Sequence, residues 1–462
     1  MVIDIFILFF VFVSLILSFK YKFAQFKFLK VSYKTLNQSV RNKENKHKAF
    51  LLSLGNHIGA GNIVGVCSAM LIGGLGSLFW MSFCLLFTSI YSLIENSLGV
   101  KYNMLIDGEY RGGSPYYILK GMNNKSLSFI FACVLLLSST VFFLPVQVNA
   151  LKESIDIVFS IKKIYVFIAL FLFSLLFLFK GTKKILKISD FIVPLMTVLF
   201  IAICLLVIVI NIKEVPKAIY LIFKEAFYNL NFKTIVGSFL GGSISVGFRR
   251  SVFSNEAGIG TAPSFNSMVK TDPLEQAYLQ VFACFIDTVV MCTLFGLVII
   301  LSGIDYTKYD ASSLAIKTFE CLFNHKWGLY LGSIFLFFFS FVTIIGSYYS
   351  GETNSLFFGN KRSKRTKNIY RIIFSICLFI GVFFEENTLW ELVDYGIVIL
   401  GIINVYVMIK MRRKFEEILA KNEKFSWKTF IFKIVDKLKI LFYNLIVWDV
   451  RVCTICEPNI NF

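Results

Sequence analysis

The sequence predicts an all-α membrane protein that crosses the bilayer about eleven times, and three observations support this. Of the 462 residues, 57% are hydrophobic and 17% are aromatic, more than a soluble globular protein contains. The apolar residues fall into runs of about 20, the length that a helix needs to cross the hydrocarbon core. The alternation of apolar and polar residues that is typical of membrane-spanning barrels is not found.

The expected spans are apolar runs separated by polar loops. They cover approximately residues 2–19, 49–72, 77–99, 126–148, 163–181, 189–211, 234–259, 278–301, 328–349, 368–385 and 390–411. The first run is predicted to be a spanning helix whose start lies outside the cell. It contains Asp4, lacks the basic start of a secretory signal, and has no small-residue cleavage site before Lys20.

The basic residues predict the orientation of the spans. The loop over residues 20–48 is rich in Lys and Arg, so it is expected to lie in the cytoplasm. If each span reverses direction, the basic loops near Arg111, Lys184 and Arg362 also lie inside, and the acidic loop near Glu386 lies outside. The net charge of +19 is therefore attributed to membrane orientation and not to nucleic-acid binding.

The second expected span contains glycines and polar residues that a plain spanning helix does not need. Gly55, Gly59 and Gly61 fall close together, with Asn56 and Asn62 among them. Glycine costs about 1 kcal/mol against alanine inside a helix, and polar side chains at bilayer depth need a partner or a cavity. This pattern predicts a helix that is interrupted near residues 59–61, with its freed peptide groups lining a site.

The seventh expected span has the same character, since Gly237, Gly241, Gly242 and Gly247 interrupt an apolar segment. The alternative for both segments is close helix packing through small residues. Because each segment is followed by about four further spans, the two are predicted to open two halves of an inverted repeat, five spans plus five. The expected regions are an N-terminal helix and basic loop (1–48), a first repeat (49–211), a second repeat (212–411) and a basic amphipathic cytoplasmic tail (412–462).

The interrupted helix suits an amino acid as ligand. The part that restarts near Gly61 and Asn62 offers free N–H groups and a positive dipole end to a carboxylate. The part that ends near Gly55 and Ile58 offers free carbonyls to a sodium ion or an ammonium group.

Small residues allow a ligand to approach the backbone closely. Two groups are predicted to line the substrate site on this ground: Gly59, Ala60 and Gly61 in the first segment, and Gly241, Gly242 and Ser243 in the second.

Three further polar residues inside spans are candidates for the site. Gln147 can reach a crevice between the repeats or form an interhelical hydrogen bond. Thr343 can offer its hydroxyl to an ion or to its own preceding turn. Asp287 is a candidate cation ligand or proton carrier, or else a buried partner for Arg249 or Arg250.

Other polar residues are assigned structural roles. Glu95 and Glu256 are expected to form structural pairs or gate contacts, and His57 to be a tolerated polar residue, although it is a candidate proton carrier. The lone CxxC at Cys453 and Cys456 has no His nearby, so no zinc site is expected. Because no nucleophile with its base, no phosphate loop and no metal cluster is found, an enzyme is not expected.

The motifs, taken together, resemble the alanine or glycine:cation symporter family. The resemblance covers about residues 50–395 and rests on GAGNIVGVCSAMLIGGLGSLFWM, DGEYRGGSPYYILKGM, PVQVNAL, FRRSVFSNEAGIGTAP with KTDP, FIDTVVMCT and TIIGSYYSGE. It implies a leucine-transporter-type fold and sodium-coupled uptake of small neutral amino acids in a prokaryotic inner membrane.

The resemblance also implies roles for particular residues. Those implied for substrate are Gly59, Gly61, Asn62 and Gln147. Those implied for a sodium ion are the carbonyls near Gly55 and Ile58 and the hydroxyl of Thr343. The sequence departs from the family pattern at His57, Ala60 and Val342, where other residues are usual.

The predicted function is a symporter that imports alanine or glycine with sodium, with no cofactor beyond that coupling ion. Two alternatives stay open. One is proton-coupled uptake through Asp287 or His57. The other is a sensor or scaffold that binds an amino acid without moving it.

Overall fold

A computed structural model describes residues 2–37, 50, 51, 54, 57–178, 182–227, 242–323, 325–358 and 363–422. The chain divides into two compact units, Met1–Phe415 and Glu416–Phe462. Apart from α21, the features that follow belong to the first unit. Of the predicted amphipathic tail, the helix α21 (Arg412–Asn422) is described, and the rest, including the CxxC, lies outside the described residues.

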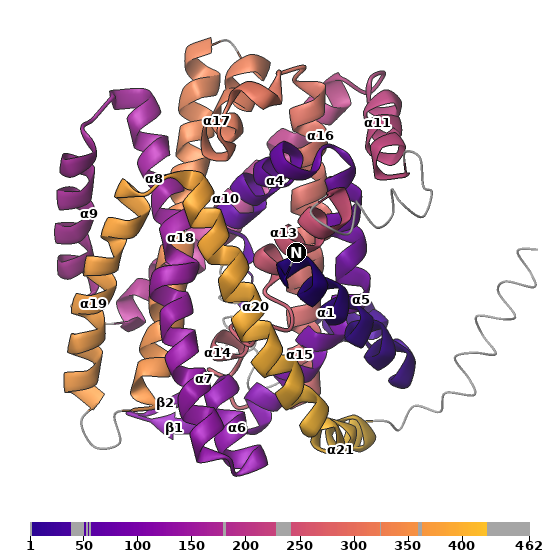
Figure 1. The fold of residues 1–462 in the computed structure, drawn as a ribbon, viewed down its shortest axis with the longest axis vertical. Helices are drawn as coiled ribbons and strands as arrows, with labels where there is room; N and C mark the ends of the chain where they lie inside the picture. Colours follow the sequence, from indigo (N-terminus) through magenta and orange to yellow (C-terminus); the bar gives the residue numbers. More distant parts are fainter. Residues whose placement is uncertain are drawn as a thin grey trace, which may run out of the picture. The chain divides into compact units, whose positions relative to one another are not determined.

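The first unit is built from helices, most of them long and apolar (Figure 1). In chain order they are α1 (Val2–Lys20), α2 (Phe28–Asn37), α4 (Ala60–Gly73), α5 (Gly76–Lys101), α6 (Ser114–Met122), α7 (Lys125–Leu137), α8 (Leu144–Phe159), α9 (Lys163–Leu178), α10 (Thr182–Ile210), α11 (Val215–Phe227), α13 (Ser243–Asn255), α14 (Pro263–Asn266), α15 (Pro273–Cys284), α16 (Thr293–Leu301), α17 (Ala311–Leu322), α18 (His325–Leu356), α19 (Ser363–Phe383) and α20 (Glu386–Lys410).

Eight helices in the described part of the chain are long and apolar enough to cross a membrane. Two shorter apolar helices, at Ala60–Gly73 and Lys163–Leu172, coincide with the predicted spans 49–72 and 163–181. The seventh predicted span, 234–259, is described only from residue 242. The helical, multi-pass architecture predicted from the sequence is therefore confirmed.

One short segment between the helices is not helical. The strands β1 (Met104–Ile106) and β2 (Glu109–Arg111) form an antiparallel hairpin between α5 and α6, with Met104 opposite Arg111. Asp107 and Gly108, which connect the strands, both have positive φ, and this dipeptide is favoured in tight hairpin turns for that reason.

Local sequence signals explain where several helices begin. Asp272 caps α15, because its carboxylate accepts hydrogen bonds from the N–H groups of Leu274 and Glu275, both at 3.0 Å. Pro273 occupies the first turn of that helix, where its missing N–H costs nothing. The Asn124 side chain caps α7 in the same way.

Two spans contain a π-helical segment, η2 (Ser138–Phe142) between α7 and α8, and η3 (Phe285–Cys292) between α15 and α16. Short 3-10 segments, η1 (Ala24–Lys27) and η4 (Tyr306–Lys308), lie in loops. A π segment widens a helix by one residue, which rotates the side chains that follow and is common at functional sites. Both π segments lie near the cavity described below.

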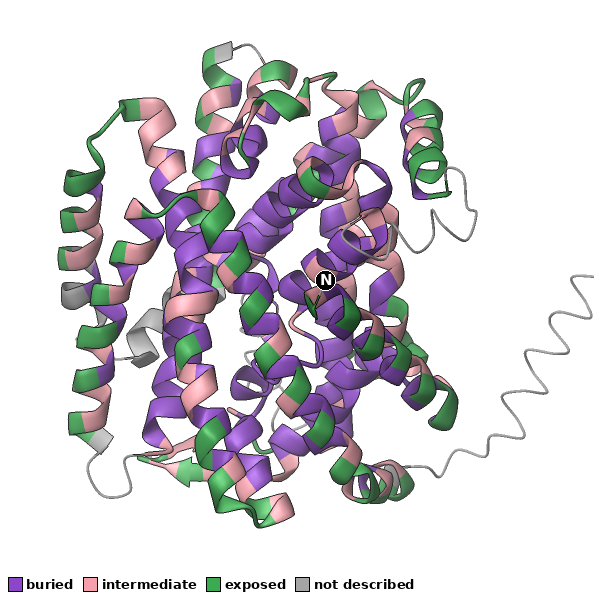
Figure 2. Ribbon diagram, in the orientation of Figure 1, coloured by how far each residue is buried: buried purple, intermediate pink, exposed green. Residues whose placement is uncertain are grey.

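The interrupted segments lie in the interior. Figure 2 shows α4 and α13 mostly buried, while α9 and α19 expose one face each. The helices α4, α5 and α13 pack against one another, and α8 packs against α18 and α19. A segment that is buried on all sides holds its polar groups only where they find protein partners or a cavity.

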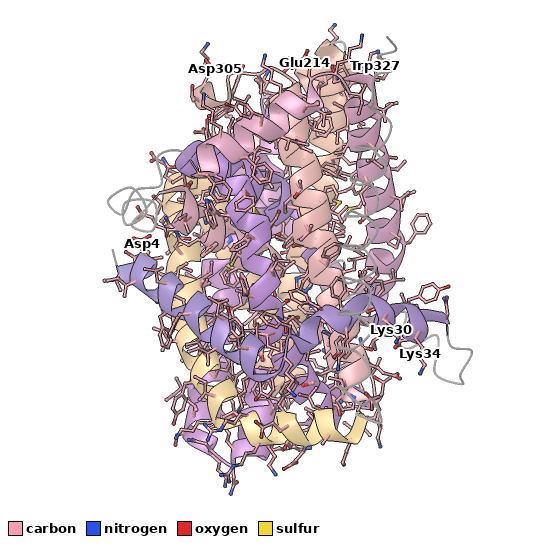
Figure 3. All side chains as sticks on the ribbon, turned by 90° about the vertical axis from the view of Figure 1, so that its right-hand side faces the viewer. Asp4, Lys30, Lys34, Glu214, Asp305 and Trp327 are labelled. Carbon is pink, nitrogen blue, oxygen red and sulfur yellow. The ribbon has the colours of Figure 1, made fainter. Side chains whose placement is uncertain are left out.

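Loops that the alternation of spans assigns to one side do lie together. In Figure 3, Glu214, Asp305 and Trp327 lie at one end of the unit. Lys30 and Lys34, from the basic loop, lie away from that end. Asp4, in the first predicted span, does not lie at that end either, although the start of this span is predicted to lie outside.

Candidate functional site

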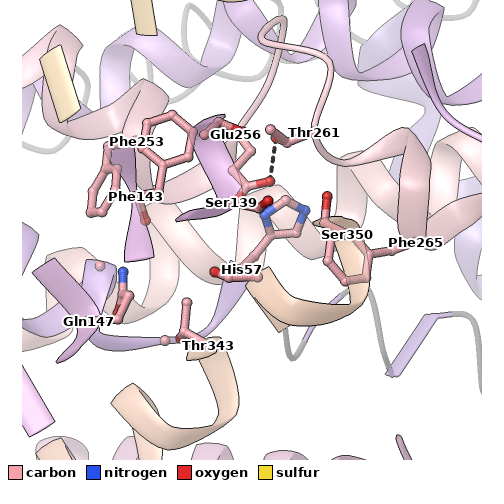
Figure 4. A pocket seen from close by; sticks show the side chains of 15 residues that line it. His57, Ser139, Phe143, Gln147, Phe253, Glu256, Thr261, Phe265, Thr343 and Ser350 are labelled. Carbon is pink, nitrogen blue, oxygen red and sulfur yellow. Dashed lines mark hydrogen bonds between the residues drawn. The ribbon is translucent and has the colours of Figure 1, made fainter. Parts of the chain in front are cut away.

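A cavity lies where the two interrupted segments meet (Figure 4). Further lining residues come from η2, α8 and α18. The full set is His57, Gly59, Gly61, Ser138, Ser139, Phe143, Gln147, Phe253, Ser254, Glu256, Thr261, Phe265, Thr343, Ser347 and Ser350.

The first interruption lies at Ile58 and Gly59, as the glycine pattern predicts. The N–H of Ile58 donates to the Leu54 carbonyl at 2.7 Å, the bond of a helical turn. Gly59 is extended, with φ −138° and ψ −162°, and α4 then begins at Ala60. The N–H groups of a first helical turn have no partner within the helix, so the positive end of α4 faces the cavity at Gly61.

Gly59 is required by its contact with α18. A Cβ at this position would overlap the hydroxyl of Thr343, so no larger residue fits without moving the helix. The Thr343 hydroxyl donates to the Phe339 carbonyl at 2.9 Å, which is the bond to its own preceding turn. Its oxygen keeps lone pairs for a cation, and the hydroxyl lines the cavity.

Asn62 stabilises the backbone of the first interruption through hydrogen bonds of its side chain. Its side-chain oxygen accepts a hydrogen bond from the N–H of Gly59 at 3.2 Å, and its amide nitrogen donates to the Asp287 carboxylate at 2.5 Å. Asn62 is buried behind the cavity wall and does not line it. Within the structure, the residue is a positioning group for the helix start.

Asp287 lies fully buried in η3 and accepts hydrogen bonds from neutral donors. Besides Asn62, the donors are the hydroxyls of Ser254 at 2.6 Å and Thr288 at 2.7 Å. No basic side chain among the described residues pairs with it. The carboxylate therefore links α4 to α13, and its charge lacks a balancing cation in the described part of the chain.

The alternative that paired Asp287 with Arg249 or Arg250 is wrong. Both arginines bind Asp394 in α20, at 2.7 Å and 3.1 Å respectively. Arg249 also lies 3.9 Å from Asp4 of α1. The pairing partner lies on a helix more than 140 residues away in the chain, which no local pattern reveals.

The second interruption follows α13, at residues 256–262. Glu256, Gly258 and Gly260 all have positive φ, and a Cβ at Gly258 or Gly260 would be strained. Glu95 of α5, fully buried, accepts the N–H groups of both glycines at 3.0 Å. Asn404 of α20 donates to the same carboxylate at 2.6 Å, so the expected structural role of Glu95 is what the contacts show.

The glycines predicted to break this segment differ from one another. Gly242 is extended, with φ −87° and ψ −165°, which is consistent with the predicted break. Gly242 precedes the first residue of α13, Ser243, and neither residue lines the cavity. Gly247 lies inside the regular helix, so its predicted interruption is wrong. A Cβ there would lie 2.6 Å from the Ser77 carbonyl, which shows close packing on α5. Gly237 and Gly241 lie outside the described residues.

Four of the predicted site residues line the cavity: Gly59, Gly61, Gln147 and Thr343. Ala60 and Ile58 are buried beside it, and Gly55 lies outside the described residues. Gln147 is 3% exposed, and its side-chain oxygen has no hydrogen-bond partner among the described residues. An acceptor that is buried and unpaired in a cavity wall is suited to a ligand donor.

Sequence reasoning missed most of the other lining residues. They are Ser138, Ser139, Phe143, Phe253, Ser254, Thr261, Phe265, Ser347 and Ser350. The glycine pair in NEAGIGT repeats the pattern of GNHIGAG and was an available signal for Thr261. The phenylalanines look like any core aromatic residue in sequence.

Aromatic and charged residues pack in series beside the cavity, on the side where α20 begins. Phe143 and Phe253 line it, with ring centroids 5.8 Å apart. Trp390 packs on Phe253 at 5.2 Å, and the Arg250 guanidinium lies 4.0 Å from the Trp390 ring. Arg250 in turn binds Asp394.

A similar series of packed aromatic and charged residues lies beside the cavity on the side of the β1–β2 hairpin. Phe265 lines the cavity and packs on Tyr349 at 5.6 Å, and the buried Arg111 guanidinium lies 4.8 Å from that ring. Arg111 pairs with Glu109 at 2.6 Å and lies 3.6 Å from Glu352. On both sides of the cavity, packed aromatic residues are therefore followed by an arginine and its carboxylate partners.

The ligands available near the cavity are oxygens. In the described part of the chain, no group of three or more His, Cys, Asp and Glu residues is arranged to hold a metal ion. Neutral hydroxyl and carbonyl oxygens suit a hard cation and do not suit a transition metal.

Comparisons with known proteins agree with the geometry. A sequence model described as the sodium:alanine symporter family matches residues 1–429. The amino-acid carrier protein AlsT of Bacillus subtilis is 32% identical over 409 residues, covering 87% of this chain and 86% of AlsT. The probable sodium/glutamine symporter GlnT of B. subtilis is 31% identical, covering 84% and 81%.

The sodium/alanine symporter AgcS of Methanococcus maripaludis is 32% identical over 358 residues, covering 75% of this chain and 77% of AgcS. Among solved structures, a manganese transporter from Eremococcus coleocola aligns over 88% of this chain and 93% of its own, with a TM-score of 0.43 and 13% identity.

Proposed function

The chain belongs to the sodium:alanine symporter family, and we propose that it is a symporter that imports small neutral amino acids with sodium by alternating access. It is a multi-pass membrane protein and not an enzyme. The observation that carries the proposal is the cavity between two interrupted segments. It is lined by Gly61, at the start of α4, and by Gln147, whose side-chain oxygen has no hydrogen-bond partner among the described residues.

The substrate carboxylate is assigned to the start of α4. The first-turn N–H groups near Gly61 and the positive end of the helix favour an anion at that point. Gln147 supplies an acceptor for the ammonium group across the cavity. Substrate roles for Ala60, Gly242 and Ser243 have no contact with the cavity to support them.

Two places near the site suit the cation. One is the Thr343 hydroxyl with the backbone at Ile58, to which Gly55 would add a carbonyl. The other is Asp287, whose buried charge lacks a basic partner among the described residues and is stabilised by a cation. Sodium moving inward releases about 2.3 kcal/mol per charge for each 100 mV of membrane potential.

The fold proposed for this function is an N-terminal helix followed by two inverted five-helix repeats of the leucine-transporter type, in a prokaryotic plasma membrane. The end that carries Glu214, Asp305 and Trp327 faces outside, and the basic loops and the tail face the cytoplasm. In this orientation the Arg250–Trp390 layer is the outer gate and the Arg111–Tyr349 layer is the inner gate. Opening them in turn gives alternating access.

The test is uptake of labelled alanine into proteoliposomes with and without an inward sodium gradient. Stimulation by sodium supports the proposal. Uptake that ignores both sodium and proton gradients would overturn it.

A proton-coupled symporter is the second candidate, favoured by the buried, unbalanced charge of Asp287. Replacing sodium by choline at fixed pH separates the two, since only sodium coupling then fails. A non-transporting sensor or scaffold is distinguished by amino-acid binding with no counterflow of labelled substrate.

A further inference from the structure

A network of buried amide side chains reaches the cavity through His57. The Asn266 amide nitrogen donates to the side-chain oxygens of Asn96 and Gln280, both at 2.8 Å. Gln276 donates to the Asn266 oxygen at 3.1 Å, and the Gln280 amide nitrogen contacts His57 Nε2. All five side chains are buried.

This network determines which nitrogen of the neutral His57 imidazole carries the hydrogen. Because the Gln280 oxygen accepts from Asn266, its NH₂ group faces His57, and Nε2 must accept. The hydrogen of the neutral ring is then on Nδ1.

Nδ1 is a buried donor that lacks a partner. His57 is 3% exposed and lines the cavity, and Nδ1 has no hydrogen-bond partner among the described residues. The Ser254 backbone carbonyl approaches the ring but does not meet the geometry of a hydrogen bond to Nδ1. A buried donor without an acceptor destabilises the protein, so this position is suited to an acceptor on the ligand.

The other side chains on this side of the cavity are also polar. Figure 4 shows Glu256, Thr261 and Ser350 on the side of His57, and Gln147 and Thr343 on another. The Thr261 hydroxyl donates to the Glu256 carboxylate, and both oxygens of a carboxylate accept hydrogen bonds. A methyl group would leave these polar groups without a ligand partner.

We propose that His57 is a specificity-determining residue, which selects amino acids whose side chain both accepts and donates a hydrogen bond, such as serine and glutamine, over alanine. This inference rests on the proposed function, in which the zwitterion occupies the side of Gly61 and Gln147. The side chain then points toward His57, where its oxygen accepts from Nδ1 and its hydrogen turns to Glu256.

The experiment measures binding to the purified full-length protein in sodium buffer, by ligand-induced thermal stabilisation. The probes are serine, glutamine, alanine and 2-aminobutyrate, the last of which has a methyl group where serine has its hydroxyl. Serine and glutamine are expected to half-saturate the wild type at about tenfold lower concentration than alanine or 2-aminobutyrate.

Two variants separate the role of the Nδ1 atom of His57 from that of its Nε2 atom. His57→Gln keeps an amide at the place of Nε2 and loses the Nδ1 donor. His57→Asn keeps a donor near Nδ1. The preference is expected to vanish in H57Q, because serine and glutamine lose more affinity than alanine and 2-aminobutyrate do, and to persist in H57N.

Equal binding of serine and 2-aminobutyrate by the wild type would overturn the proposal without any variant. So would an equal loss of all four ligands in H57Q. Sodium-driven uptake is measured in parallel. Preference without uptake contradicts the proposed transport alone, and uptake without preference contradicts the role of His57 alone.

Discussion

The two helix interruptions have a similar backbone form, but their peptide groups have different hydrogen-bond partners. Each joins helical segments through glycines beside the same cavity, but the peptide groups of the second are already occupied. Glu95 accepts the N–H groups of Gly258 and Gly260, and Asn404 completes the contact. At the first interruption, Asn62 accepts only the N–H of Gly59, and the start of α4 stays open to the cavity.

This difference assigns the two interruptions separate tasks. The buried Glu95 carboxylate links the second interruption to α5 and α20, so we expect it to be a rigid part of the cavity lining, which we call the fixed wall. The first places the positive end of α4 at the cavity, where Gly61 lines it, so it is the place we propose for a substrate carboxylate. Substitutions at the second should therefore act on stability, and substitutions at the first on binding and transport.

The largest effect is expected for Glu95→Ala. It removes the acceptor for two buried N–H groups and one amide, and each orphaned donor costs about 1 to 3 kcal/mol. The free energy of unfolding should fall by about 3 kcal/mol or more, measured by thermal unfolding in detergent. Glu391→Ala is the control, because Glu391 is exposed. Equal stability of the two variants would contradict the fixed-wall role.

Gly59→Ala tests the first interruption. The added methyl group overlaps Thr343, and overpacking of this kind costs about 1 to 3 kcal/mol, up to roughly a hundredfold in affinity or uptake. Gly65→Ala, on the same helix, meets only an ordinary contact with Phe253 at 3.9 Å and should leave uptake near wild type. Equal uptake by the two variants would show that the close approach is not needed.

Asp287→Asn tests whether the buried carboxylate between the interruptions senses the cation. The substitution keeps the shape and removes the charge. If Asp287 stabilises sodium, the sodium concentration for half-maximal uptake should rise about tenfold. Asp305→Asn, in an exposed loop, is the control. An unchanged sodium dependence would confine Asp287 to linking α4 and α13.

The smallest effects are expected at the two gates. Arg250→Gln should expose the cavity to the outside and Arg111→Gln to the inside, each by several-fold. The first substitution removes one ring contact and one carboxylate pair, and the second removes one ring contact and two carboxylate pairs. The measurement is labelling of Ser347→Cys by an impermeant thiol reagent, in a background without accessible native cysteines. Exposure from the same side in both variants would refute the assignment of the gates.

The sequence predicted what depends on short-range pattern. Apolar runs gave the helices, and the glycines with Asn62 gave the first interruption, because a polar residue beside glycines is unfavourable in an unbroken spanning helix. Gly247 was wrongly predicted to interrupt its helix, because in sequence a glycine that permits close helix packing cannot be told from one that breaks a helix. The hairpin was missed because its strands have only three residues each.

Contacts between residues that are far apart in the chain could not be predicted from local sequence patterns. Asp287 could be assigned to Arg250 or to the site with equal reason until Asp394 was found in contact with both arginines. The tautomer of His57 likewise depends on Asn266 and Gln280, far apart in the chain from the ring. Phe253 and Phe143 line the cavity, but nothing in their neighbours distinguishes them from core residues.

The most direct test is sodium-dependent binding of labelled alanine to the purified protein, with alanine and its amide, which lacks the carboxylate, as competitors. Binding at the open start of α4 predicts that sodium, but not choline, supports binding and that the amide competes at least tenfold more weakly than alanine. Equal competition by the amide, or binding indifferent to sodium, would contradict the assignment of the substrate and its ion to the first interruption.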